Sequence, residues 1–337
     1  MSVFTPITLA EARDFLASYQ VGDIIDFQDI AAGVENSNFF VTTASGRYVL
    51  TIFEKIPRSD LDFYMGLMTH LADKGFSCAA PIKTIAGDVL GTIKGKPAAL
   101  VARLSGGDIA HPNKHDCEAV GVALAQMHLA AADFELPMAN WRGRTWWQQE
   151  AAGLAPYATI EENKLLASEL IYQSQFDELS LPRGIIHADL FRDNILWRTH
   201  GHTEMSAHAE AQHPQMIDFY FACHDYLLWD VAITVNDWCL DLAAYPAAKL
   251  HAANTAALLK GYQRIRPFTV EERHTWPQML RAGALRSWLG RLGYHYYPRQ
   301  SSLTHTKDHS FSMRLLQFHI ANHAQAAIYF PESSCAL

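Results

Sequence analysis

The chain has 337 residues, of which 49% are hydrophobic and 18% are charged, and its formal net charge at pH 7 is -8. This length and composition exclude a disordered protein and allow two units with separate cores. The acidic balance provides no basic footprint for nucleic acid or for an anionic membrane, so we expect neither as a partner.

The cysteines and the N-terminal segment indicate a cytoplasmic protein. Five cysteines are scattered along the chain without CxxC pairs, which argues against a disulfide framework and a zinc knuckle. Residues 1–15 include Glu11, Arg13 and Asp14 where a signal peptide would have an apolar run. The most apolar later stretch, 217–235, is interrupted by three aspartates and a histidine, so we expect no membrane span.

The first third of the chain predicts helices around a β-hairpin. A helix is expected over residues 8–20, beginning after Thr8. The strand-like segment 39–42, a turn at 44–46 and the apolar run 48–53 predict the hairpin. A second helix is expected from 60 to 74, with an apolar stripe at Leu61, Tyr64, Met68 and Leu71.

Helical patterns dominate after residue 105. The run 97–104 predicts an edge strand that leads into a hinge at Ser105. An amphipathic core helix is expected over 114–130, where His128 fits a core histidine better than a metal ligand. Two polar helices are expected within 144–175.

The polar stretch 184–196 is where we expect the functional site. Two apolar pairs, Ile185-Ile186 and Ile195-Leu196, predict short buried strands on the two sides of a polar hairpin. The hairpin contains His187, Asp189, Asp193 and Asn194, and Asp218 ends the next apolar run. Carboxylate and amide oxygens suit Mg²⁺, although Asp193 alone fits an ordinary turn residue.

The segments after this stretch add supporting residues. Residues 198–214 contain four histidines without metal-ligand spacing, which favours a solvated insertion loop. Asp230 opens an apolar helix expected over 231–242. It would cap this helix or accept backbone N–H groups of the hairpin at 187–194, called the catalytic loop below. Asp237, on the next turn, fits either a partner for a substrate ammonium or a solvated helix carboxylate. The last helix is expected over 308–329.

Arginines are concentrated in a helix near the C-terminus. Thr269 and Glu272 predict a capping box, and Pro277 predicts the start of the arginine-bearing helix. Arginine is the best bidentate receptor for a carboxylate. Arg286 and Arg291 are five residues apart and would point about 140° away from each other on a helix, so they would not share one ligand. Of the two arginines we choose Arg286 as the substrate contact.

The spacing Asp189-x4-Asn194, followed by Asp218, matches the catalytic-loop aspartate, metal-binding asparagine and second metal-binding aspartate of protein kinases. Residues 187–194 resemble the H-x-D-x-x-x-x-N signature of the aminoglycoside phosphotransferase and choline kinase superfamily. Within it, the chain is similar to the bacterial homoserine kinases over segments 36–41, 48–51, 187–194, 217–220 and 230–238, in that order.

The resemblance implies an α+β, protein-kinase-like two-lobed fold, with a small antiparallel β-sheet N-lobe and a mostly helical C-lobe. Residues 1–104 would form the nucleotide-covering lobe, and residues 105–337 the catalytic and acceptor-binding lobe. The implied reaction uses ATP and Mg²⁺ to phosphorylate the hydroxyl of a small amino-acid-like acceptor, L-homoserine, to O-phosphohomoserine in threonine biosynthesis.

The same resemblance implies roles for residues of the catalytic loop. Asp189 would accept or orient the hydroxyl proton while His187 braces the loop, and Asn194 and Asp218 would hold Mg²⁺. Arg192 is a candidate substrate contact through a phosphate.

For the nucleotide, the resemblance implies contacts from two segments of the first lobe. The candidate contacts are Gly33, Asn36, Ser37 and Asn38 for the phosphates and Val101 and Leu104 for the adenine. The superfamily places a lysine on the third strand, where this chain has Thr51, and the helix 60–74 offers no glutamate to pair with it. A nucleotide-binding module without catalysis is therefore one alternative.

Another alternative keeps the chemistry and changes the acceptor to choline, methylthioribose or an aminoglycoside. An aminoglycoside kinase should have an acid-rich acceptor rim, whereas residues 277–303 include arginines and no acids. This composition favours an acceptor with a carboxylate.

Overall fold

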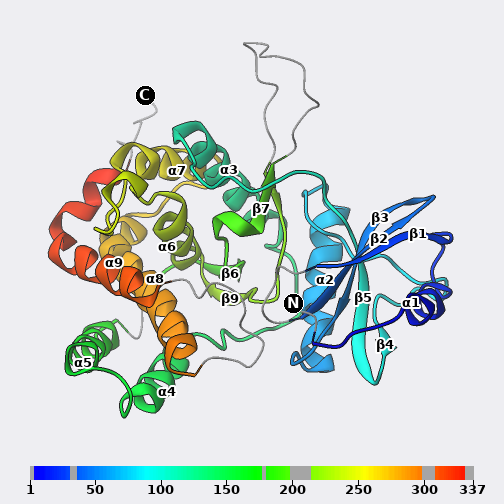
Figure 1. The fold of residues 1–337 in the computed structure, drawn as a ribbon. Coiled ribbons are helices and arrows are strands. Elements are labelled where there is room, and N and C mark those ends of the chain that lie inside the picture. The colour runs from blue at the N-terminus through cyan, green and yellow to red at the C-terminus, as the bar shows by residue number, and fades with distance from the viewer. Residues whose placement is uncertain (1–3, 31–35, 177–179, 198–213, 298–307, 331–337) are drawn as a thin grey trace. The chain divides into compact units, whose positions relative to one another are not determined.

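The computed structural model describes residues 4–30, 36–176, 180–197, 214–297 and 308–330. The chain divides into two compact units, the first ending at Ser105 and the second beginning at Gly106 (Figure 1). Gly33 and nearly all of the expected insertion loop lie outside the described residues. None of the helices in the described segments combines the length and apolarity that a bilayer crossing requires.

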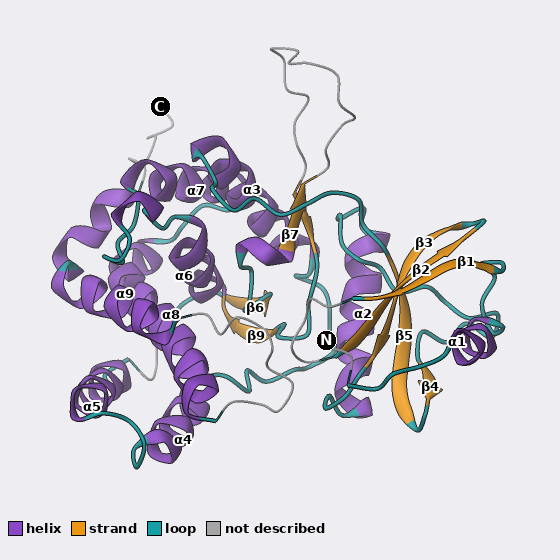
Figure 2. Cartoon of the chain, viewed as in Figure 1, coloured by secondary structure: helices purple, strands orange, loops and turns teal. Residues whose placement is uncertain are grey.

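The first unit is built on a five-stranded antiparallel sheet with the order β1-β2-β3-β5-β4 (Figure 2). Its elements are α1 (Leu9–Leu16), β1 (Ile24–Asp29), β2 (Ser37–Thr43), β3 (Gly46–Ile52), α2 (Arg58–Asp73), β4 (Gly91–Ile93) and β5 (Lys96–Ala102). The predicted hairpin is confirmed as β2 and β3. The edge-strand prediction for 97–104 is wrong, because the short strand β4 pairs with the outer side of β5.

One core cluster of the first unit lies on one face of this sheet. Along β2 every second side chain is buried, so Phe39 and Val41 point to the same side as Leu50 of β3. Phe15 and Leu16 of α1 pack on them, and α1 begins at Thr8 with the full capping box. The stripe predicted for α2 is confirmed, since all four of its members are buried.

The second unit is mostly helical. Its elements are α3 (Lys114–Ala130), α4 (Arg144–Leu154), α5 (Ile160–Ser174), β6 (Arg183–Ile186), η1 (Arg192–Asn194), β7 (Ile195–Trp197), β8 (Pro214–Met216), β9 (Cys223–Tyr226), α6 (Leu227–Trp238), η2 (Leu242–Ala244), α7 (Ala252–Ile265), α8 (Val270–Tyr296), α9 (His309–Ala321) and η3 (His323–Tyr329). Helix α8 packs against both α6 and α9, and α6 contacts the short strands β6 and β9 (Figure 1).

The strands on the two sides of the catalytic loop do not pair with each other. Strand β6 pairs with β9, and β7 pairs with β8. The predicted strands are therefore confirmed and the predicted hairpin is wrong. The backbone of β6 bonds to residues 223–226, and the backbone of β7 bonds to residues 214–216. Within the described part of the second unit, the loop between β6 and β7 therefore has no strand partner of its own and is held by side chains.

Several helix boundaries differ from the sequence predictions, beginning with α1, which ends at Leu16 and not at residue 20. Helix α6 begins at Leu227, so Asp230 lies in its first turn and not at its cap. The capping box at Thr269 is confirmed, but it starts one helix that continues through Pro277 to Tyr296. The last helix ends at Ala321, and a 3₁₀ segment follows it. An interior proline removes one backbone hydrogen bond and crowds the carbonyl four residues earlier, so α8 depends on its tertiary packing to continue through Pro277.

Two glycines allow α3 and α7 to approach closely. A Cβ on Gly121 would lie 2.1 Å from the backbone oxygen of Leu258, and a Cβ on Gly261 would lie 2.1 Å from that of Glu118. Any side chain at either position would force these helices apart. The close contact matters for the site because His128 of α3 and Tyr262 of α7 meet across it.

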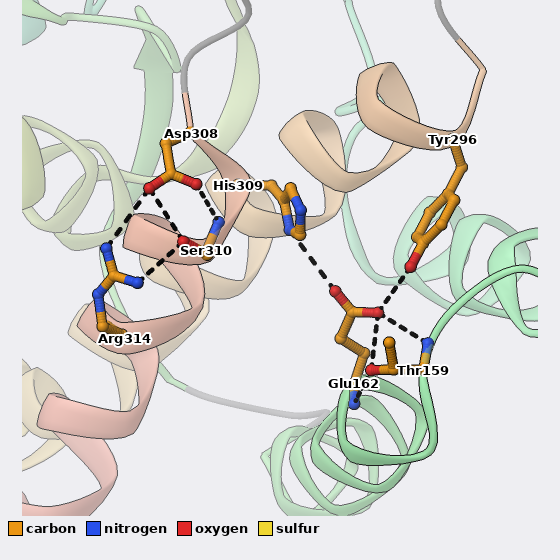
Figure 3. A network of polar contacts seen from close by, with 7 residues as sticks. All are labelled: Thr159, Glu162, Tyr296, Asp308, His309, Ser310 and Arg314. Carbon is orange, nitrogen blue, oxygen red and sulfur yellow. Dashed lines mark hydrogen bonds and ion pairs between the residues drawn. The ribbon is translucent and has the colours of Figure 1, made fainter.

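A polar network joins α5 to the ends of α8 and α9 (Figure 3). Glu162 accepts hydrogen bonds from the Thr159 backbone N–H and from the Tyr296 hydroxyl, at 2.8 and 2.9 Å. His309 Nδ1 lies 3.5 Å from the other carboxylate oxygen. Burial alone would raise the pKa of Glu162, but these contacts hold it below its usual value. The network fixes the C-terminal end of α8 and the start of α9, two helices that line a pocket described below.

A buried histidine links α9 to α6 and, through Asn236, to α8. His319 Nε2 donates to Asn236 Oδ1 at 2.8 Å, and Asn236 Nδ2 donates to the Leu280 carbonyl at 2.9 Å. Complete burial lowers the pKa of His319 from 6.5 to about 3. The folded protein therefore binds fewer protons than the unfolded chain below pH 6.5, and it loses stability as the pH falls.

We expect the His319→Gln variant to have a flatter pH dependence of stability. In the wild-type protein this histidine should lower the free energy of unfolding by about 2 kcal/mol between pH 7 and pH 5. Glutamine keeps a donor for Asn236 and does not titrate. Urea unfolding at both pH values measures the difference, with the exposed His115→Gln as control. Equal pH dependence of wild type and His319→Gln would contradict the prediction.

Candidate active site

Asp189 lies between an amide and a guanidinium. Asn194 Nδ2 donates to the Asp189 backbone oxygen at 2.8 Å and to its Oδ2 at 3.3 Å. The other oxygen, Oδ1, lies 2.9 Å from Arg286 Nη2. Arg286 belongs to α8 and is only 2% exposed, so a buried positive charge fixes the direction of a carboxylate that remains partly accessible.

Helix α6 holds the backbone of the catalytic loop at three places. Asp230 accepts the first two N–H groups of the loop. Trp238 Nε1 donates to the Leu190 carbonyl at 3.2 Å, and Asp237 Oδ2 accepts the Arg192 N–H at 2.9 Å. These three side chains lie within about two and a half turns of one helix, so the loop takes its shape from α6.

Asp230 is the most connected of these side chains. Its Oδ2 accepts the His187 N–H at 2.7 Å, and its Oδ1 accepts the Ala188 N–H at 2.9 Å. His128 Nε2 donates to Oδ2 at 3.0 Å, and His128 Nδ1 accepts from the Tyr262 hydroxyl at 2.7 Å. Both predictions made here are confirmed: His128 is a satisfied core histidine, and Asp230 accepts N–H groups of the loop.

The electrostatics favour an ionised Asp230. Burial alone would raise its pKa, but the hydrogen bonds from the His128 side chain and from the His187 backbone N–H hold it below its usual value. The ionised carboxylate also stabilises Ala188, whose φ of 60° is unfavourable for a residue with a Cβ. The strained turn directs the next side chain, Asp189, out of the buried strand β6.

His187 joins the loop to the segment that follows β8. The side chain is fully buried, and its Nε2 donates to the Ile217 carbonyl at 3.0 Å. Its ring lies 4.7 Å from the ring of Phe219. Burial lowers the pKa of His187 and so keeps the imidazole neutral, against the charges of Asp230 and Asp189. This placement fits a bracing role, and His187 itself does not reach the accessible side of the loop.

Asn194 and Asp218 both lie at one end of the β7–β8 pair. The Ile217 N–H donates to the Asn194 carbonyl at 3.1 Å, so the exposed Asp218 follows directly after a residue bonded to Asn194. Asp218 has a φ of 62°, which turns it away from the strand path. Asn194 uses its Nδ2 on Asp189, and its Oδ1 takes no part in that contact.

These oxygens fit Mg²⁺ better than a transition metal. No group of three or more His, Cys, Asp or Glu side chains arranged to hold a metal occurs in the described part of the chain. Mg²⁺ needs no such cage, because it is usually held by one or two carboxylates together with phosphate oxygens and water.

Two of the predicted substrate residues, Arg192 of the loop and Asp237 of α6, contact each other. Asp237 is 8% exposed, so its interpretation as a solvated helix carboxylate is wrong. Its Oδ2 accepts from Arg192 Nε at 3.1 Å, and Arg192 Nη1 donates to the Ala110 carbonyl at 2.7 Å. The Arg192 guanidinium is therefore fixed by a carboxylate and a backbone oxygen within the second unit.

The nucleotide candidates of the first unit lie on two faces of its sheet. Ser37 and Asn38 alternate along β2, so Ser37 points into the buried face and Asn38 to the half-buried one. On the half-buried side, Thr51 Oγ1 donates to Asn38 Oδ1 at 2.8 Å. Val101 is buried in β5, and Leu104 lies just past its end. Where the superfamily has a lysine, this chain has a neutral side-chain pair.

An ion pair that the sequence analysis missed lies on the opposite face. Lys96 Nζ pairs with Glu54 Oε2, and Glu54 Oε1 accepts from Ser37 Oγ at 2.6 Å. Thr5 Oγ1 donates to the same carboxylate at 3.1 Å. Burial alone would raise the pKa of Glu54, but these partners hold it below its usual value. No spacing rule connects residues 5, 37, 54 and 96, so no sequence signal predicts this cluster.

Comparisons with known proteins agree with this geometry. The model of the phosphotransferase enzyme family matches residues 26–268. A homoserine kinase of Methylobacillus flagellatus is 44% identical over 325 residues, which are 96% of this chain and 97% of the relative. A homoserine kinase of Paraburkholderia xenovorans is 42% identical over 333 residues, covering 98% and 99% of the two chains.

Solved structures with a similar fold are more distant in sequence. An amicoumacin kinase in complex with AMP-PNP, Ca²⁺ and its ligand has a TM-score of 0.67 at 16% identity, covering 94% of this chain and 93% of its own. A microcompartment-associated aminopropanol kinase has a TM-score of 0.64 at 15% identity, covering 96% and 97%. These similarities concern the fold, and they confirm the predicted α+β class with a small antiparallel sheet and a larger helical part.

Proposed function

The chain belongs to the phosphotransferase enzyme family, and we propose that the site around Asp189 transfers the γ-phosphoryl group of ATP to the hydroxyl of L-homoserine. The protein is an ATP-using kinase with the activity of a homoserine kinase, which forms O-phosphohomoserine for threonine biosynthesis. The observation that carries the choice of acceptor is the 44% identity to a homoserine kinase over nearly the whole of both chains.

Asp189 is the proposed catalytic base. The acceptor hydroxyl would donate to the Asp189 carboxylate, whose direction is fixed by Asn194 and Arg286. A carboxylate suffices, because phosphoryl transfer depends mainly on positioning and on charge neutralisation. Arg286 therefore acts as a positioning residue for Asp189, and His187 acts through the backbone of the loop.

Asn194 and Asp218 would hold Mg²⁺ through Oδ1 of the amide and the carboxylate. When bound, Mg²⁺ would neutralise charge on the transferring phosphate oxygens. The residues of this chain supply the placement: the Ile217 N–H bond to the Asn194 carbonyl keeps the two ligands at one end of the β7–β8 pair.

We expect Asp218→Asn to raise the Mg²⁺ concentration needed for half-maximal activity by at least about tenfold, because one of two protein ligands loses its charge. Calorimetry should show the same change without turnover: Mg²⁺ should strengthen ATP binding by the wild type much more than by the variant. Asp241→Asn, which removes a carboxylate paired with Lys249, is the control. Equal Mg²⁺ dependence in all three proteins would exclude Asp218 as a ligand.

The nucleotide contacts in the first unit are proposals of the same kind. Backbone N–H groups near Asn36, Ser37 and Asn38 would approach the phosphates, and Val101 and Leu104 would contact the adenine. Thr51 and Asn38 bond to each other and neither side chain is charged, which supports binding of the phosphates by backbone N–H groups in place of a lysine. A cytoplasmic location is proposed from the cysteine usage, and four of the five cysteines are free and buried.

An acceptor panel tests the function directly. ADP release with Mg²⁺-ATP should be fast with L-homoserine and at least about a hundredfold slower with choline, methylthioribose or an aminoglycoside, since the wrong acceptor leaves charged groups of the site unpaired. Preference for another acceptor would replace homoserine in the proposal. Nucleotide binding without turnover of any acceptor would favour the non-catalytic alternative.

A further inference from the structure

A pocket in the second unit brings a carboxylate and a guanidinium to one space. Its lining includes Asp237 from α6, Arg291 and Ser287 from α8, and Ser312 from α9. Phe191, two residues after Asp189, also lines it, so the pocket adjoins the catalytic loop. The surrounding helices are fixed by the contacts of Glu162 and His319 described above.

Arg291 supplies a positive charge that needs an anion. Its Nη1 donates to the neutral Ser312 hydroxyl at 2.6 Å. Among the described residues, no carboxylate lies within ion-pair distance of this guanidinium. Burial lowers the pKa of Arg291. The charges of Asp237, Asp193 and Asp189 raise that pKa, and none of these carboxylates forms an ion pair with the guanidinium. A ligand carboxylate would supply the missing partner.

Asp237 supplies the opposite charge on the same lining. Both of its hydrogen bonds, from the Arg192 N–H and from Arg192 Nε, go to Oδ2. Its Oδ1 has no protein partner in the part of the chain that the structure describes. A carboxylate oxygen in a nearly buried pocket is suited to an ammonium group.

We infer that this pocket binds the amino-acid head group of the acceptor, with its carboxylate on Arg291 and its ammonium on Asp237. The inference rests on the proposed function and names the residues that would select an amino acid over a simple alcohol. It also replaces Arg286 as the carboxylate receptor, because the Arg286 guanidinium faces Asp189. Asp237 and Arg291 line the same pocket without forming an ion pair with each other, and a zwitterion would bind both of them.

Two matched acceptors separate the two contacts. The compound 3-aminopropan-1-ol is homoserine without its carboxylate, and 4-hydroxybutanoate is homoserine without its ammonium. We expect Arg291→Met to lower kcat/KM for homoserine by about 10- to 100-fold, as the loss of a charge-assisted pair predicts. The same variant should change kcat/KM for 3-aminopropan-1-ol by less than about threefold, because that acceptor has no carboxylate to lose.

Asp237→Asn should give the complementary pattern. It should lower kcat/KM for homoserine and 3-aminopropan-1-ol by a similar factor and lower kcat/KM for 4-hydroxybutanoate much less, because that acceptor loses only the effect of the weakened Arg192 Nε contact. The asparagine Oδ1 can still accept the Arg192 N–H, so the loop keeps that backbone contact. Arg314→Met on α9 is the control for a lost arginine, since its guanidinium binds Asp308 and Ser310 (Figure 3) and Arg314 is not among the residues that line the pocket.

The outcome that would overturn the inference is an equal loss of kcat/KM by Arg291→Met for homoserine and 3-aminopropan-1-ol, as a purely structural role predicts. Arg291→Lys, which keeps the charge, should recover part of the selectivity and provides a second variant if methionine unfolds the protein. Calorimetry of homoserine binding in the presence of AMP-PNP separates the two proposals. Unchanged binding by Arg291→Met refutes the pocket, whereas binding without turnover by the wild type refutes the proposed function.

Discussion

Replacing Asp189 by asparagine should lower kcat for homoserine phosphorylation by about 10²- to 10⁴-fold, the range expected for loss of a positioned proton acceptor. The amide has the same size and keeps a contact for Asn194, but it cannot take the hydroxyl proton. The dissociation constant of Mg²⁺-ATP should change by less than about threefold, because the proposed metal ligands Asn194 and Asp218 remain. Single-turnover kinetics and nucleotide titrations measure the two effects separately.

The neighbouring carboxylate provides the matched control for this prediction. Asp193→Asn changes an exposed acid in the same loop and should retain activity within a few-fold. Because Arg286 loses its ion pair in Asp189→Asn, thermal unfolding of that variant should be measured as well. Equal losses of turnover and nucleotide binding, or near wild-type turnover, would rule out Asp189 as the base.

Replacing Asp230 by alanine should lower the free energy of unfolding by about 3–5 kcal/mol, the usual cost of removing one partner from a buried charged network. The substitution leaves the N–H groups of His187 and Ala188 and the imidazole of His128 without their common acceptor. The strained turn at Ala188 also loses its stabilising contact. Urea or thermal unfolding measures the loss.

Activity should fall together with stability in Asp230→Ala, because the strained turn that directs Asp189 is no longer fixed. Asp108→Ala, at an exposed position, is the control and should change stability by less than about 0.5 kcal/mol. A loss below about 1 kcal/mol for Asp230→Ala would be too small for an ionised acceptor of three buried donors and would refute the network. Since the pKa of Asp230 is held low, its contribution should persist at neutral pH and disappear only as the pH falls through that low value.

Local signals predicted the individual elements well. The capping residues Thr8 and Thr269 determine helix starts through bonds to residues three positions away, and these starts are confirmed. The stripe on α2 and the β2–β3 hairpin depend on spacings of a few residues and are confirmed as well. Such features need no knowledge of the rest of the fold, because both partners lie close together in the sequence.

Pairing between distant segments could not be predicted in this way. Apolar pairs at 185–186 and 195–196 indicate strands, but they do not say which strand lies beside which. Their partners, 223–226 and 214–216, follow a long polar segment that the hairpin interpretation had set aside. The edge-strand prediction for β5 is wrong for the same reason, since a three-residue strand with a weak pattern covers its outer side.

The sequence by itself predicted the chemistry of this protein through the order and spacing of His187, Asp189, Asn194 and Asp218. It also predicted the kinase-like fold class that the comparisons confirm. The tertiary structure alone decided how the charges are used. Helical periodicity shows that Arg286 and Arg291 point in different directions, but only the packing of α6 and α9 against α8 decides which one faces Asp189 and which one faces the pocket. That choice depends on contacts between residues far apart in the chain, which a periodic pattern does not encode.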